Sequence, residues 1–136
     1  MFWKAFEFND LDAAAEILND DRPSMAKKIG RRVKNFDDAR WSRVAFSYVV
    51  AGNILKFTQN SVMGRYLLST NNSILVEASP YDEVWGIGMN ELEASYVWGL
   101  RGVDPSTWKG KNLLGFALME ARDAMRVDML DKYLPL

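Results

Sequence analysis

The fold class of this protein is indicated most clearly by residues 41–60, which read WSRVAFSYVVAGNILKFTQN. Apolar side chains recur there every third or fourth position, the spacing that places them on one face of an α-helix. The members of this stripe are Trp41, Val44, Ala45, Tyr48, Val49, Gly52 and Leu55, with Lys56 as the one charge. Asn35 or Asp37 can cap the helix, and Gln59-Asn60 closes it. The sequence therefore predicts one long central helix.

Helical signals also occur on both sides of this segment. They predict helices over residues 10–18, 23–29, 63–68 and 112–128. Residues 74–77 favour a short strand, residues 84–85 favour a second, and residues 89–110 predict a long loop because they hold three glycines and a proline. We therefore expect a mainly α (α+β) fold with a few short strands, in a single domain over residues 1–136.

The composition excludes several kinds of chemistry. The chain has 136 residues, is 49% hydrophobic and 26% charged, and contains no cysteine and no histidine. Zinc sites built on Cys and His, cysteine nucleophiles and Ser-His-Asp triads are therefore excluded. Acidic pairs such as Asp20-Asp21 and Asp37-Asp38 fit helix caps better than metal ligands. We expect no metal and no cofactor, so any catalysis must use carboxylates, lysine, hydroxyls or backbone groups.

The chain opens on an apolar segment, MFWKAFEF over residues 1–8. It has no capping residue and no turn signal, so it is typical of the second half of a buried helix. A second chain, in a homo-oligomer or another complex, could cover Phe2, Phe6 and Phe8. No run is long enough to span a membrane, and residues 1–8 lack the features of a signal peptide. We expect a cytoplasmic protein without a membrane partner.

Lys4 is the first candidate for chemistry, because its sequence neighbours are apolar. A lysine that loses hydration has a lowered pKa, and its neutral amine can attack a carbonyl to form an imine. Two structural alternatives remain open. Lys4 could extend its ammonium into water, or it could pair with Glu7 three residues later.

A second group of candidates precedes the last predicted helix. Lys109 and Lys111 flank Gly110, and Asn112 starts the helix. Free N–H groups at a helix N-terminus attract anions such as phosphate. Gly115, in the first turn, weakens the helix and indicates close approach of a ligand or of another backbone.

Further candidates lie in the middle of the chain. Asp82, Trp85, Gly86 and Gly88 offer a carboxylate, an aromatic platform and a tight turn that could hold a sugar and stack a base. Glu77 ends the predicted strand and could serve as a general base or a ribose ligand, or could be a surface residue. A basic run could contact phosphates or could be a solvated face; it comprises Lys27, Lys28, Arg31, Arg32 and Lys34.

The order of these motifs resembles the NADAR/YbiA-like family, also called DUF1768. The motifs are Lys4-Ala5 with Phe8 and Asp10, Gly30-Arg31, Lys56-Phe57, Glu77-Ala78-Ser79, the WGIG of residues 85–88, and Trp108 to Arg122 with Gly110, Asn112 and Gly115. The resemblance covers nearly the whole chain and implies a compact helical domain. Family members carry a further segment before the lysine, so we expect this sequence to start inside the family's N-terminal region.

The resemblance implies an N-glycosidase that cleaves N-ribosyl bonds. Family members act on phosphoribosylamino-pyrimidines of riboflavin synthesis or remove ADP-ribose from guanine bases in DNA. By motif, Lys4 matches the imine-forming lysine, whereas Asp82, Trp85 and Gly86 match the sugar-and-base pocket. Asn112 and Gly115 match the phosphate-side loop, and Glu77 and Arg31 match family positions.

These matches predict a division of roles. Lys4, Glu77 and Asp82 would be catalytic. Substrate would be bound by Arg31, Trp85, Gly86, Gly88, Lys109, Lys111, Asn112 and Gly115. The partner would be an ADP-ribosyl or phosphoribosyl small molecule, or ADP-ribosylated DNA. The alternative is a non-catalytic protein that binds ADP-ribose or serves as a structural subunit.

Overall fold

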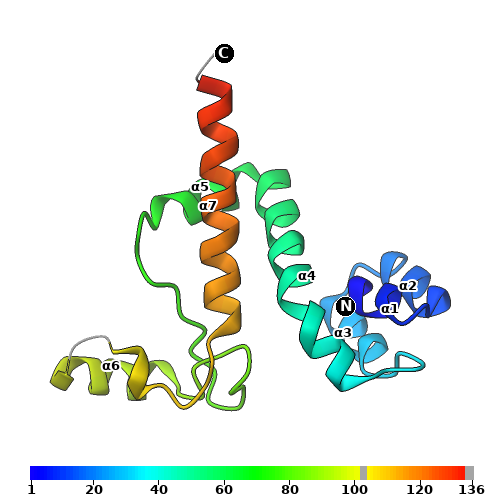
Figure 1. Cartoon of the computed structure of the whole chain (residues 1–136), viewed down its shortest axis with the longest axis horizontal. Helices are drawn as coiled ribbons and strands as arrows, with labels where there is room; N and C mark the ends of the chain where they lie inside the picture. Colours follow the sequence, from blue (N-terminus) through cyan, green and yellow to red (C-terminus); the bar gives the residue numbers. More distant parts are fainter. Residues whose placement is uncertain (102–103, 134–136) are drawn as a thin grey trace. The chain divides into compact units, whose positions relative to one another are not determined.

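A computed structural model describes the backbone of residues 1–101 and 104–133, and the side chains of residues 1–99 and 104–127. The helices of this part are α1 (Phe2–Glu7), α2 (Leu11–Leu18), α3 (Pro23–Gly30), α4 (Asp38–Gln59), α5 (Ser61–Ser69), α6 (Glu91–Arg101), the 3-10 helix η1 (Pro105–Thr107) and α7 (Leu113–Tyr133). The mainly helical prediction is confirmed (Figure 1).

Local sequence signals account for most helix starts. The carboxylate of Asp10 accepts a hydrogen bond from the Ala13 N–H and caps α2. Pro23 opens α3, and the carboxylate of Asp37 accepts the Arg40 N–H at the start of α4. The two carboxylates satisfy N–H groups that have no partner inside a helix, and a proline in the first turn has no N–H that would need one. These helices could be predicted because their caps are local.

The predicted short strands are wrong within the described residues. Residues 73–79 have no regular secondary structure and pair with no strand, and residues 83–85 form a turn. This segment bonds instead to one side chain: the carboxamide of Asn112 donates to the Leu75 carbonyl at 2.9 Å and accepts the Glu77 N–H at 3.0 Å. Asn112 thus supplies the donor and acceptor that a neighbouring strand would have supplied.

The predicted loop over residues 89–110 is also wrong, because α6 and η1 lie in it. Asn90 and Glu93 cap α6 reciprocally. The Asn90 side chain accepts the Glu93 N–H at 2.9 Å, and the Glu93 carboxylate accepts the Asn90 N–H at 3.0 Å. This is a capping box. The Asn-x-x-Glu spacing therefore indicated a helix start, but the loop prediction relied on the glycine content instead. Residues 102–103 of the predicted loop lie outside the described residues.

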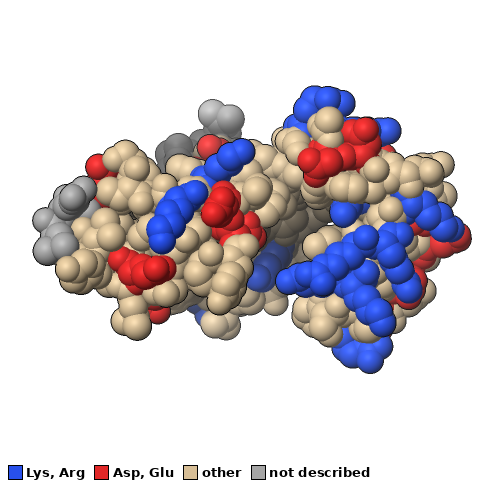
Figure 2. Space-filling view, turned by 90° about the horizontal axis from the view of Figure 1, so that it is seen from below, with Lys and Arg blue, Asp and Glu red and all other residues tan. Residues whose placement is uncertain are grey.

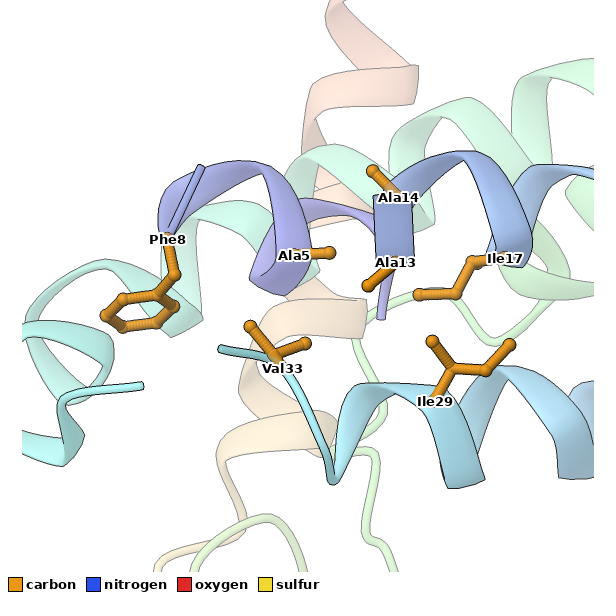
Figure 3. Packing of buried hydrophobic residues seen from close by; sticks show 7 residues of the cluster. All are labelled: Ala5, Phe8, Ala13, Ala14, Ile17, Ile29 and Val33. Atoms are coloured by element: carbon orange, nitrogen blue, oxygen red, sulfur yellow. The ribbon is translucent and has the colours of Figure 1, made fainter. Parts of the chain in front are cut away.

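The chain forms two compact units, which are described separately: an N-terminal unit (Met1–Tyr48) and a C-terminal unit (Val49–Leu136). In the N-terminal unit, α1, α2 and α3 pack around one apolar cluster. Its buried members are Ala5, Phe8, Ala13, Ala14, Ile17, Ile29 and Val33 (Figure 3). The prediction of a single domain stays a prediction.

The C-terminal unit has two apolar clusters. In the first, α5 packs against α7, where Phe57, Leu67 and Met125 are buried (Figure 1). The second contains Ile87, Met89 and Ala94, with Trp98 and Trp108 packed against it. Among the described helices, none is both long and apolar enough to cross a membrane.

Candidate functional site

Lys4 lies on α1 in the N-terminal unit, and its side chain is half-buried. Its Nζ lies 3.8 Å from the centroid of the Phe36 ring. Burial lowers the pKa of Lys4, and the nearby Asp38 carboxylate partly opposes this effect. The environment therefore favours the neutral amine more than water does.

The predicted alternative of a Lys4–Glu7 ion pair is not what the structure shows. The Glu7 carboxylate accepts hydrogen bonds from Arg40 Nε at 2.7 Å and from the Tyr48 hydroxyl at 2.6 Å. The Tyr48 bond, followed by the Arg40 bond, lowers the pKa of Glu7, and the bond to Glu7 raises the pKa of Tyr48. Sequence reasoning missed this network, because Glu7 is more than 30 residues from both Arg40 and Tyr48 along the chain.

Aromatic rings surround the same part of α1. Tyr48 stacks on Trp3, with ring centroids 5.4 Å apart and an angle of 8° between the planes. Tyr48 also stacks on Trp41 at 6.1 Å and 17°. Since stacked rings resist rotation, these contacts fix the direction of the Tyr48 hydroxyl. Tyr48, a member of the apolar stripe of α4, therefore packs against α1.

Arg31, the other candidate in the N-terminal unit, is exposed directly after α3. Two of its basic neighbours are paired, Arg32 with Glu16 at 2.5 Å and Lys34 with Asp12 at 3.2 Å. Figure 2 shows Lys and Arg side chains gathered over part of the surface. Pairing partly neutralises Arg32 and Lys34, although both ion pairs are exposed to solvent.

In the C-terminal unit, backbone hydrogen bonds join residues 83–87 to residues 109–114. The N–H groups of Lys109 and Gly110 both donate to the Ile87 carbonyl, at 3.0 and 2.8 Å. Donations from Lys111 to Glu83, Asn112 to Gly86, Leu113 to Val84 and Leu114 to Trp85 continue the series at 2.8–3.2 Å. The WGIG motif and the loop before α7 are therefore one folded element.

Three glycines permit this close packing. A Cβ on Gly86 would lie 2.8 Å from the Asp82 carbonyl, and one on Gly110 would clash with the Gly86 carbonyl. A Cβ on Gly115 would clash with the Leu75 carbonyl and the Asn112 carboxamide. Of the two explanations for Gly115, the structure thus shows close approach of another backbone. Gly88 has a φ of +66°, a conformation that glycine adopts without strain.

This arrangement corrects the reasoning about phosphate at the start of α7. The N–H groups of residues 109–114 already donate to carbonyl groups, so they are not free to bind an anion. The side chains of Lys109 and Lys111 remain available for that role, since both are exposed. Lys109 Nζ lies 3.7 Å from the Glu93 carboxylate, which partly neutralises it.

The two candidate carboxylates occupy different settings. Asp82 Oδ1 accepts the N–H groups of Val84 and Trp85, at 3.0 and 2.7 Å, and so orders the turn that carries the half-buried Trp85. Glu77 has an exposed side chain, whereas its backbone is held by Asn112 and Ile87. Asp82 therefore has a structural task besides any chemical one.

Asn112 was predicted to bind substrate, and the structure places it in the interior. It is 0% exposed and has a φ of +53°. Both ends of its carboxamide are hydrogen-bonded, to the Leu75 carbonyl and to the Glu77 N–H. Arg122 is 3% exposed and similarly donates to the Thr70 hydroxyl and the Ser73 carbonyl. Both side chains hold the chain from residue 70 to residue 77 in place. No group of three or more acidic side chains suited to a metal ion occurs among the described residues.

The candidates thus fall into two sets. Lys4 and Arg31 belong to the N-terminal unit. The C-terminal unit contains Glu77, Asp82, Trp85, Gly86, Gly88, Lys109, Lys111, Asn112 and Gly115, and it brings most of them together in one folded element. Their assigned roles stay predictions.

Comparisons with known proteins show which family the chain belongs to. The sequence profile of the NADAR domain matches residues 1–126. N-glycosidase R617 of Acanthamoeba polyphaga mimivirus is 39% identical over 123 residues, which cover 90% of this chain and 69% of the viral protein. Protein irg-1 of Caenorhabditis elegans is 32% identical over 92% of this chain and 57% of its own length. N-glycosidase YbiA of Shigella boydii is 28% identical over 93% of this chain and 69% of its own length. The chain belongs to the NADAR domain family.

Proposed function

We propose that this protein is an N-glycosidase that cleaves an N-ribosyl bond. Its membership of the NADAR family supports the proposal, as do the two relatives named N-glycosidase. The proposed substrate is either ADP-ribose attached to guanine in DNA or a phosphoribosylamino-pyrimidine of riboflavin synthesis. Both substrates carry a sugar whose C1 is bonded to a nitrogen of a base.

The setting of Lys4 is the observation that carries the proposal. Its amine is half-buried, lies over the Phe36 ring and has a lowered pKa, while the carboxylate one turn away bonds to other groups. A lysine whose ammonium form is disfavoured is available as a nucleophile nearer neutral pH.

The proposed reaction balances with these residues and water. The bond from C1 to the base nitrogen breaks, and its electron pair leaves with the base, which takes a proton from Glu77 or Asp82. The Lys4 amine bonds to C1 and gives up a proton to water, and the sugar ring opens to an imine. Water then hydrolyses the imine, releasing the free sugar and the amine.

The remaining candidates are proposed to bind substrate. Trp85 would stack on the base or pack on the sugar, next to the turn of Gly86 and Gly88. Lys109 and Lys111 would attract phosphate through their side chains, and Arg31 would bind a second anionic group. Asn112 and Gly115 would contribute by shaping the loop.

Trapping of the imine tests the proposal. Free ADP-ribose exposes an aldehyde at C1 when its ring opens, and borohydride reduces an imine to a stable amine. We expect an intact-mass increase that peptide mapping assigns to Lys4, and no adduct in Lys4→Ala. Lys56→Ala is the matched control, because Lys56 also lies near an aromatic ring, 5.3 Å from the Phe57 centroid. It should retain the adduct.

The same experiment separates the alternatives. A folded protein that forms no adduct and turns over neither proposed substrate would instead support a non-catalytic NADAR protein, whose ADP-ribose binding calorimetry would measure. If turnover occurs, assays with ADP-ribosylated DNA and with the phosphoribosylamino-pyrimidine decide the substrate. Native mass shows whether a second copy takes part.

A further inference from the structure

Glu7 should by its position be the natural partner of Lys4. The two residues are three apart on α1, a spacing that brings an acid and a lysine together on one helix face. Such a pair would hold the lysine in its ammonium form, since a nearby negative charge stabilises the charged state. An ammonium cannot attack C1, so the pair would oppose the proposed chemistry.

Two residues of α4 bind the Glu7 carboxylate instead. Arg40 Nε donates to Oε1 at 2.7 Å, and the Tyr48 hydroxyl donates to Oε2 at 2.6 Å. Arg40 also donates from Nη2 to the Glu7 backbone carbonyl at 2.9 Å. The Glu7 side chain is only 13% exposed. Both carboxylate oxygens are therefore engaged, and the side chain has little freedom to turn toward Lys4.

The two donors are themselves held in place. Tyr48 is stacked on Trp3 and Trp41, which fixes the direction of its hydroxyl. The Arg40 guanidinium lies 5.5 Å from the centroid of the Phe8 ring. The stacks on Trp3 and Trp41 thus bury apolar surface and also hold Tyr48 where it binds the Glu7 carboxylate.

The other charged groups around Lys4 do not replace Glu7 as a close partner. Asp38, on α4, acts on Lys4 through space, and the terminal amine of Met1 repels it. The carboxylates of α2 bind elsewhere: Asp10 binds the N–H groups of Ala13 and Lys34, Asp12 binds Lys34 Nζ, and Glu16 binds Arg32. Asp37 binds the Arg40 N–H. α3 contributes no acidic residue and two lysines, Lys27 and Lys28.

We propose that Arg40 and Tyr48 are positioning residues for Lys4: by binding both oxygens of Glu7, they keep this carboxylate from pairing with the Lys4 ammonium. The catalytic part of this inference rests on the proposed function, in which Lys4 is the nucleophile. Lys4 is thereby left against the Phe36 ring, which attracts its cation only weakly. The amine can then lose its proton nearer neutral pH.

Tyr48→Phe is the cleanest test, because it removes the hydroxyl, changes no charge and keeps the ring that stacks on Trp3 and Trp41. The readout is the rate at which acetic anhydride modifies Lys4 at each pH, followed by peptide mass spectrometry. Without the hydroxyl, Glu7 regains an oxygen that can reach Lys4. We expect the midpoint of Lys4 modification to rise by about one pH unit, which slows modification at pH 7 about tenfold.

Three further variants complete the experiment. Arg40→Met should raise the midpoint in the same direction, and Tyr66→Phe, which changes a 75% exposed tyrosine on α5, should leave it unchanged. Glu7→Gln combined with Tyr48→Phe should return the midpoint to its original value or below it, because no carboxylate remains to be released. Circular dichroism of each variant verifies that it folds.

Two results would overturn the proposal. One is an unchanged or lowered midpoint in folded Tyr48→Phe. The other is a raised midpoint that persists when Glu7 is also Gln, since Tyr48 would then act by another route. Neither measurement needs substrate. Failure of both imine trapping and turnover in the unaltered protein would therefore refute the proposed function while leaving the relationship between Glu7 and Lys4 to be decided separately.

Discussion

The Asn112 carboxamide lies 2.9 Å from the Leu75 carbonyl and also binds the Glu77 N–H, so that one buried side chain holds a segment 35 to 37 residues earlier in the chain. This contact connects the start of α7 to the segment that ends at Glu77. It gives the backbone of Leu75 and Glu77 hydrogen-bond partners although residues 73–79 pair with no strand. The first two predictions follow from it.

The Asn112→Gly and Asn112→Ala variants should differ in stability, because only alanine is strained by the backbone conformation at this position. Both lose two buried hydrogen bonds, at about 1 kcal/mol each. Alanine should lose about 1 kcal/mol of stability in addition, because φ at this position is +53°, a conformation that strains alanine but not glycine. Urea unfolding should therefore rank the stabilities as Asn, then Gly, then Ala. Equal stabilities of the Gly and Ala variants would show that the strained backbone relaxes.

Gly115→Ala and Gly52→Ala should have opposite effects on stability. A methyl group on Gly115 clashes with the Leu75 carbonyl and the Asn112 carboxamide, whereas one on Gly52 meets nothing within 4 Å. We expect a loss of about 1–3 kcal/mol for Gly115→Ala and a gain of about 0.5–1 kcal/mol for Gly52→Ala, which lies inside α4. Thermal unfolding of both variants measures the contrast. A Gly115→Ala protein as stable as the original would contradict this packing.

Substitutions of Asp82 can separate its structural task from its proposed chemistry. Asp82→Asn keeps an oxygen that can accept the Val84 and Trp85 N–H groups but cannot exchange a proton at neutral pH. If Asp82 is the acid, Asp82→Asn should lower kcat about 100-fold or more with little change in Tm. Asp82→Ala should lower both. Full activity in Asp82→Asn would assign the proton transfer to Glu77, for which Glu77→Gln is the corresponding variant.

The stability contributed by Glu7 should depend on pH. Hydrogen bonds from Tyr48 and Arg40 hold the pKa of Glu7 below its usual value of 4.5. A carboxylate whose pKa is lowered by folding stabilises the protein above pH 4.5, and this contribution disappears as pH falls through the pKa of the folded state. The difference in Tm between the unaltered protein and Glu7→Gln should therefore be largest above pH 5 and should narrow on acidification. Glu120→Gln, at an exposed position on α7, is the control and should show no such narrowing.

Lys111→Ala should weaken substrate binding more than it slows the chemical step. The backbone N–H groups of residues 109–114 are occupied, so an anion near the start of α7 depends largely on side chains. We expect KM to rise several-fold with a smaller change in kcat, and the effect should shrink at high salt. Arg65→Ala removes an exposed cation from α5 and serves as the control. A fall in kcat at unchanged KM would remove Lys111 from the phosphate role.

The amino-acid sequence by itself determined the local features of this protein. The helices α2, α3, α4 and α5 follow from caps, proline and apolar spacing that act within a few residues. The order of short motifs from Lys4 to Arg122 was enough to indicate the NADAR family, which the profile match over residues 1–126 confirms. The apolar neighbours of Lys4 also indicated correctly the direction in which its pKa moves.

Only the tertiary structure decided which groups meet across the chain. No local rule pairs Glu7 with Tyr48, 41 residues later, in place of Lys4, its neighbour on the helix. Local rules likewise give no indication that the Asn112 side chain takes the place of a strand, or that carbonyls of residues 83–87 occupy the N–H groups before α7. The physical reason is that buried polar groups must find partners, and packing of distant segments determines which partners are within reach.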